Sequence, residues 1–73
     1  MANIEVNSEV TGSIWQIKVK LGDQVETGDV LMIVESMKME IPIITEESGI
    51  VREILITEGV SVSEGQCVVI LEG

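Results

Sequence analysis

The chain contains no histidine, no phenylalanine and no tyrosine. Without an imidazole it cannot assemble a Ser-His-Asp or Cys-His relay, and it cannot hold a metal through histidine. Cys67 is the only cysteine among the 73 residues, so an internal disulfide is excluded. A reducing compartment, the cytoplasm, is therefore expected. Together these absences remove most enzyme chemistries.

Basic residues and long apolar runs are also scarce. Four Lys and Arg residues stand against 13 Asp and Glu, and the net charge of −9 opposes binding to a phosphate backbone. The longest apolar runs, 30–34 and 67–71, have five residues each, which is too short for a helix that spans a membrane. The N-terminus lacks a basic segment followed by an apolar one. Neither nucleic acid nor a membrane is an expected partner.

Val and Ile dominate what is present. They supply 22 of the 33 apolar residues, a bias that favours strands over helices. A chain of this length forms one core, so residues 1–73 are predicted to be a single domain. The acidic residues follow no Asp-x-Asp-x-Asp-Gly pattern, and we expect them to form a solvated surface.

The sequence repeats itself with an offset of 37 residues. Segment 12–35 aligns without a gap on 49–72, and seven of the 24 positions are identical. Three of the identities pair glycines, at positions where a backbone needs positive φ or a close approach. They are Gly12 with Gly49, Gly22 with Gly59, and Gly28 with Gly65.

Each half reads as four short strands, which together predict an all-β fold. The expected strands are 4–6, 13–19, a short one around 25 and 30–34, then 41–44, 50–56, a short one around 62 and 67–71. We expect a flattened β-barrel or sandwich of two four-stranded halves with pseudo-twofold symmetry. Within 13–19 and 50–56 the aliphatic residues are spaced by three and then two, which predicts a bulge in each strand. Cys67 aligns with Val30 and is expected in the core, whereas Trp15 aligns with Arg52 and is expected to be partly exposed.

The segment 35–40 occurs only once and joins the two halves as a hairpin tip. Tight hairpins usually carry Gly or Asn at the turn, and this segment has neither. Lys38 lies between Met37 and Met39 at this projecting position. The local pattern also fits a structural loop of four or five residues whose methionines point into the core. Pro42, just beyond, suits an edge strand or the start of a strand.

The tip sequence Glu35-Ser36-Met37-Lys38-Met39 resembles the Met-Lys-Met attachment motif of biotin carboxyl carrier domains, in the biotinyl/lipoyl attachment family. The resemblance extends over nearly the whole chain and includes the Gly-Asp-x-Val-x-x-Gly-Asp stretch at 22–29. Because the register leaves no room for an inserted thumb, the chain resembles the minimal, stand-alone members of the family, although a domain excised from a larger chain is an open alternative.

The resemblance implies a carrier that performs no catalysis itself. A biotin protein ligase would join biotin covalently to Lys38 and would recognise Met37 and Met39, while Glu35 and Ser36 would form the surrounding hairpin. The chain would then carry carboxybiotin from a biotin carboxylase to a carboxyltransferase.

Three other functions are compatible with parts of the pattern. Lipoyl domains resemble this family but usually place Asp before the lysine and a small residue after it, so lipoate, alone or beside biotin, remains an alternative cofactor. Acyl carrier proteins are similarly small and acidic, but they are helical, and Val and Ile argue for strands here. An unmodified β-barrel adaptor, with Lys38 as an ordinary surface residue, is the third.

Overall fold

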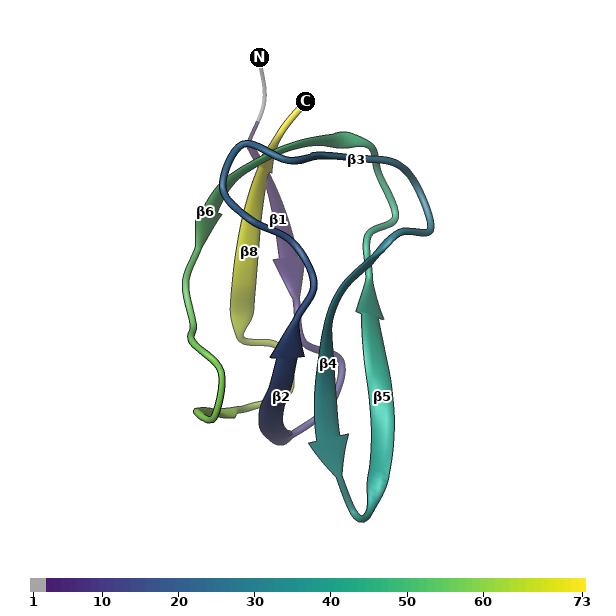
Figure 1. Ribbon diagram of the computed structural model, residues 1–73, viewed down its shortest axis with the longest axis vertical. Helices are drawn as coiled ribbons and strands as arrows, with labels where there is room; N and C mark the ends of the chain where they lie inside the picture. Colours follow the sequence, from purple (N-terminus) through teal and green to yellow (C-terminus); the bar gives the residue numbers. More distant parts are fainter. Residues whose placement is uncertain (1–2) are drawn as a thin grey trace.

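The computed structural model describes residues 3–73, which fold into strands and turns with no helix in that range (Figure 1). No helix in the described part of the chain is long and apolar enough to cross a bilayer. The eight strands are β1 (Asn3–Asn7), β2 (Gly12–Ile17), β3 (Gln24–Val25), β4 (Val30–Ser36), β5 (Met39–Ile44), β6 (Gly49–Ile54), β7 (Ser61–Val62) and β8 (Cys67–Glu72).

The strands form two four-stranded antiparallel sheets, ordered β1-β8-β6-β3 and β5-β4-β2-β7. An offset of 37 residues converts the first order into the second, so the predicted all-β sandwich with pseudo-twofold symmetry is confirmed. The sequence halves and the sheets do not coincide, however. Each sheet takes two strands from each half, and the halves are therefore interleaved. A repeated sequence does not reveal this exchange, because either pairing satisfies the same strand pattern.

The core lies between the two sheets and is built almost entirely from aliphatic side chains. Since each strand contributes its inward positions, both halves supply matched residues to one cluster. Its buried apolar members are Val6, Ile14, Val25, Leu31, Met32, Val34, Ile43, Val51, Ile56, Val62, Val68, Val69 and Leu71.

The predicted bulges are present in β2 and β6. The register skips Trp15 between β2 and β4, and it skips Arg52 between β6 and β8. A bulge places an extra residue on the outer face, and Trp15 is accordingly 50% exposed, as the alignment with Arg52 predicted. Both strands end earlier than expected, at Ile17 and Ile54, because the chain then leaves the sheet towards the next turn.

A second pair of bulges corrects the prediction for Cys67. The register skips Leu31 in β4 and Val68 in β8, so each strand turns two consecutive side chains into the core. Strict alternation would place Cys67 inward with Val69, but the bulge at Val68 reverses the side to which Cys67 points. Cys67 is therefore partly exposed rather than a core residue.

The matched glycines serve the two purposes that the repeat suggested. Gly22 and Gly28 turn the chain at φ +89° and +94°, and their partners in the second half have φ +91° and +88°. Gly12 has another role, because a Cβ there would lie 2.5 Å from the carbonyl oxygen of Glu35 in the neighbouring strand. The Gly-Asp pairs also close their own turns, since the Asp23 carboxylate accepts a hydrogen bond from the Lys20 amide at 2.9 Å.

Candidate functional site

The once-only segment forms the end of the β4–β5 hairpin. Ser36 pairs with Met39, which leaves Met37 and Lys38 as a two-residue turn with φ +52° and +64°. Two consecutive positive φ values are the signature of the type I′ turn, whose twist matches that of the strands. The turn is thus shorter than the four- or five-residue loop that the sequence left open.

The turn is unusual because neither of its two residues, which both have positive φ, is a glycine or an asparagine. Met37 and Lys38 are the non-glycine residues with positive φ in the described chain. For a side chain other than Gly, Asn or Asp, this region costs about 1–2 kcal/mol per residue. Strain of this kind persists where the surrounding structure enforces it, and it concentrates at functional sites.

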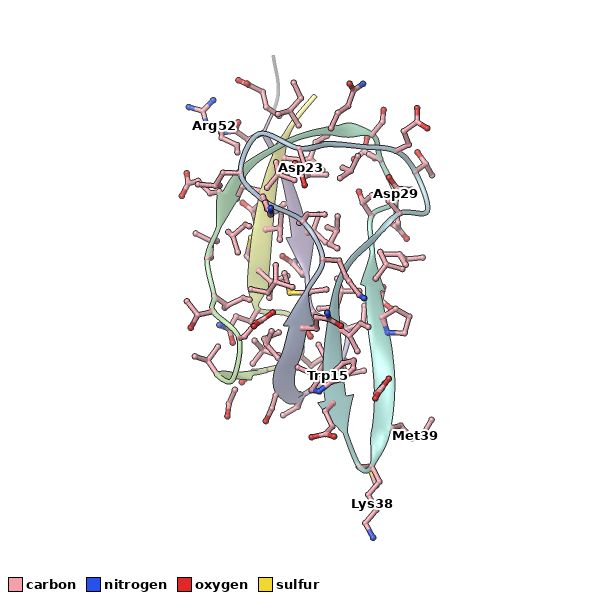
Figure 2. All side chains as sticks on the ribbon, in the orientation of Figure 1. Trp15, Asp23, Asp29, Lys38, Met39 and Arg52 are labelled. Carbon is pink, nitrogen blue, oxygen red and sulfur yellow. The ribbon has the colours of Figure 1, made fainter. Side chains whose placement is uncertain are left out.

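The side chains of the turn project into solvent. Met37 is 92% exposed and Met39 is 62% exposed, so the alternative with core-directed methionines is wrong. Lys38 extends beyond the end of the hairpin, pointing away from both sheets (Figure 2). The one ion pair among residues 3–73 joins Arg52 to Glu72 at 2.8 Å, which leaves the Lys38 amine unpaired within that range. Two exposed thioethers therefore flank an accessible amine.

Neighbouring segments support the hairpin at its base. The Ser36 hydroxyl donates a hydrogen bond to the carbonyl of Thr11 at 2.8 Å, and the Thr11 hydroxyl accepts one from the amide of Glu64 at 3.0 Å. Gly12 lets β2 approach β4 closely at this level. Thr11 and Glu64 carry no signal in the sequence, because the contacts span 25 and 53 residues. Gly12 was marked by its match to Gly49.

Acidic side chains border the turn. Glu35 lies directly opposite Glu40 in the β4–β5 register, and both are exposed. Like charges in directly opposite positions repel each other and weaken the pairing. The repulsion between Glu35 and Glu40 weakens the hairpin, whereas the hydrogen bond from Ser36 to Thr11 stabilises it.

The exposed amine of Lys38 suits covalent attachment of another group. No group of three or more acidic or cysteine side chains in the described chain is placed to hold a metal ion. An accessible primary amine at a fixed point is a nucleophile for an activated acyl group. The structure gathers all five residues singled out in the sequence, 35–39, at this hairpin end.

The chain matches the protein family described as "Biotin-requiring enzyme" over residues 2–71. A biotin/lipoyl attachment protein from Bacillus subtilis is 50% identical to it over 60 residues, which cover 82% of both chains. A biotinylated protein TB7.3 homolog from Mycobacterium leprae is 36% identical over 67 residues, covering 92% of this chain and 94% of that one.

Among solved structures, the urea carboxylase of Kluyveromyces lactis contains a matching segment. The TM-score is 0.92 with 35% sequence identity, over 99% of this chain and 6% of that much longer one. Nearly the whole length of this chain therefore matches one small part of that carboxylase. Sequence and fold agree, and the chain belongs to the biotin/lipoyl attachment family.

Proposed function

We propose that Lys38 is the attachment site for biotin and that the chain carries the group between a biotin carboxylase and a carboxyltransferase. The observation that carries this proposal is the position of Lys38 in a strained and exposed two-residue turn. The hydrogen bond from Ser36 to Thr11 supports the base of this turn. The names of the relatives, a biotin/lipoyl attachment protein and a biotinylated protein, support biotin as the group.

The residues present fit a covalently bound biotin. Nζ of Lys38 would attack the activated carboxyl group of biotin; an amide bond forms, the activating group leaves and the amine loses a proton. A biotin protein ligase would supply the activated acid and accept that proton. Met37 and Met39 would present their thioethers to the ligase, because neither side chain has a place in the core.

Once attached, biotin supplies a ring nitrogen that takes up and releases a carboxyl group. The chain's own contribution is mechanical. The described chain measures 37 × 17 × 17 Å, and the hairpin end lies at the opposite end of the long axis from the C-terminus (Figure 1). The lysine side chain and the biotin tail add about ten single bonds, with a reach on the order of 10 Å. Such a tether raises the local concentration of biotin at both partner enzymes.

The proposed role is that of a carrier with no catalytic residues. The cytoplasm is the proposed compartment, supported by the single, unpaired Cys67. Lipoate is the second candidate group, because one relative is named for both cofactors. Met37 and Met39 favour biotin, since lipoyl domains usually place Asp and a small residue at those positions.

Coexpression with a biotin ligase tests the proposal. Intact-mass measurement should show one added biotinyl group per wild-type chain and none on Lys38→Arg, whose guanidinium stays protonated. Lys18 and Lys20 are internal controls, because both are exposed and neither lies at the tip. An unmodified wild type in the presence of active ligase, or a modified Lys38→Arg, would refute the assignment. Faster labelling by a lipoyl ligase would select lipoate instead.

A further inference from the structure

Part of the outer surface of the β5-β4-β2-β7 sheet is apolar, whereas side chains in contact with water are usually polar. The register places Ile33 opposite both Pro42 and Gln16, and it places Val30 opposite Ile44. The bulge adds Trp15 beside this row. We call this surface the apolar face; its members are Trp15, Val30, Ile33, Pro42 and Ile44. Trp15 is 50% exposed, Ile44 49% and Val30 38%.

The other sheet provides an internal control for this composition. Offset by 37 positions, the equivalent residues on the outside of the β1-β8-β6-β3 sheet are Arg52, Cys67, Ile70, Glu5 and Asn7. The two surfaces share the same strand order and the same bulges, yet one carries two charges and an amide where the other is apolar. The fold itself therefore does not require Trp15 or Pro42. Apolar side chains that gather on one exposed surface without a structural need are typical of a contact with another molecule.

The apolar face lies on the sheet that bears the candidate lysine. Along β4 and β5 the order from the tip is Lys38, then the pair Glu35 and Glu40, then the pair Ile33 and Pro42. Figure 2 shows Trp15 in the half of the molecule that carries Lys38, and Arg52 in the half that carries the C-terminus. A partner that reaches Lys38 along this sheet meets two carboxylates and then an apolar surface.

We propose that the apolar face, with Glu35 and Glu40 at its border, is the docking surface for the biotin ligase. This inference rests on the proposed function. It assigns to the ligase an apolar pocket for Trp15 and neighbouring Lys or Arg side chains for the two carboxylates. Trp is among the residues that most often dominate binding at such surfaces.

The ligase is the partner that most needs this surface. It meets the carrier before biotin is attached, so its selection of this chain must come from contacts with the protein. It must also place one amine within about 1 Å of the reacting carboxyl group, and a single flexible lysine does not fix that position. Enzymes that act later can recognise the attached group itself.

The experiment compares ligase kinetics for three variants. Trp15→Arg places in the β2 bulge the residue that occupies the equivalent β6 bulge, so the backbone accommodates it. It should raise the KM for the carrier by about 10-fold or more, the range of a binding hot spot, with kcat changed less than about twofold. Arg52→Trp should leave the KM unchanged. The double variant Trp15→Arg with Arg52→Trp keeps composition and net charge, and it should behave like Trp15→Arg.

A spectroscopic measurement separates docking from an effect on folding. Trp15 is the sole tryptophan, so 5-fluorotryptophan labels one site. In a Lys38→Arg background, which prevents turnover, its ¹⁹F signal should shift saturably when unlabelled ligase is added, and the shift should weaken with salt.

An unchanged KM in Trp15→Arg, or a ¹⁹F signal that does not respond to ligase, would overturn the inference about the docking surface. If the wild type is nevertheless biotinylated, the proposed function is unaffected by that result. A signal that shifts with carrier concentration alone would point to a second copy as the occupant and would also overturn it. If the wild type is not biotinylated at all, both proposals fail.

Discussion

Met37 and Lys38 hold a backbone conformation that their side chains disfavour, at φ +52° and +64°. Asn tolerates this region far better than Met. We therefore expect Met37→Asn to raise the free energy of unfolding by about 1 kcal/mol, measured by urea denaturation. Met39→Asn is the matched control, because Met39 is in a strand and should gain nothing. Equal stabilisation by both variants would show that the turn is not strained.

For single residues, the sequence predicts positive φ well at glycines and poorly at other residue types. Gly22 and Gly28 were placed correctly in turns, because a glycine matched in both halves marks a position that needs positive φ or a close approach. The left-handed pair at the tip was not foreseen, since neither Met37 nor Lys38 is a residue that favours positive φ. The hairpin location followed from the missing repeat, whereas its length depended on the pairing of Ser36 with Met39.

Cys67 offers a pH-dependent test of the corrected position. Partial burial raises the pKa of its thiol, and the nearby Glu5 carboxylate raises the pKa further. A raised pKa means less thiolate at a given pH, so near pH 8 the folded protein should react with a disulfide reagent more slowly than the unfolded chain. The rate at which the folded protein reacts with the reagent should rise as the pH increases towards the raised pKa of the thiol. Glu5→Gln should accelerate the reaction at fixed pH, and no change would remove Glu5 as a cause.

Among the elements, the β4–β5 hairpin depends on its contact with β2. A Cβ at Gly12 would lie 2.5 Å from the Glu35 carbonyl oxygen, and one at Gly49 would lie 2.8 Å from that of Glu72. Both Gly→Ala changes should destabilise the fold by about 1–3 kcal/mol, through overpacking. Gly12→Ala should in addition slow biotinylation, because only that clash displaces the strand leading to Lys38.

Biotinylation rates at a temperature where both variants remain folded, checked by circular dichroism, separate the two effects. Equal rates in Gly12→Ala and Gly49→Ala would mean that the base of the hairpin does not position the lysine.

Strand positions and bulges were predictable because aliphatic spacing records which side of a strand is buried. The break in spacing after Ile14 and after Val51 marked the bulges at Trp15 and Arg52 correctly. The bulges at Leu31 and Val68 left no such mark, since every neighbouring residue is apolar, and Cys67 was misplaced as a result. The hydrogen bond between Thr11 and the hairpin could not be predicted from the local sequence pattern either, because Thr11 lies in a distant loop.

For the molecule as a whole, the net charge of −9 is distributed over 73 residues with one ion pair in the described part. Self-repulsion of this kind weakens a compact state and is screened by salt. Raising NaCl from about 20 mM to about 500 mM should increase stability by about 1 kcal/mol, or roughly 5 °C in Tm by calorimetry. Replacing the exposed neighbours Glu46 and Glu47 by Gln should reduce this salt dependence. A Tm independent of salt would contradict the prediction.

If Lys38 is biotinylated as proposed, the exchange of strands between the halves also determines when, during synthesis of the chain, the ligase can act on it. In the β1-β8-β6-β3 sheet, β8 is the strand that joins β1 to β6, so this sheet cannot close until residues 67–72 have been made. The β4–β5 turn is complete much earlier in the chain, but the core beneath it needs Val68, Val69 and Leu71. A ligase that recognises the folded surface would therefore not modify chains that are still being synthesised. It would attach biotin only after β8 has been made and the core has formed.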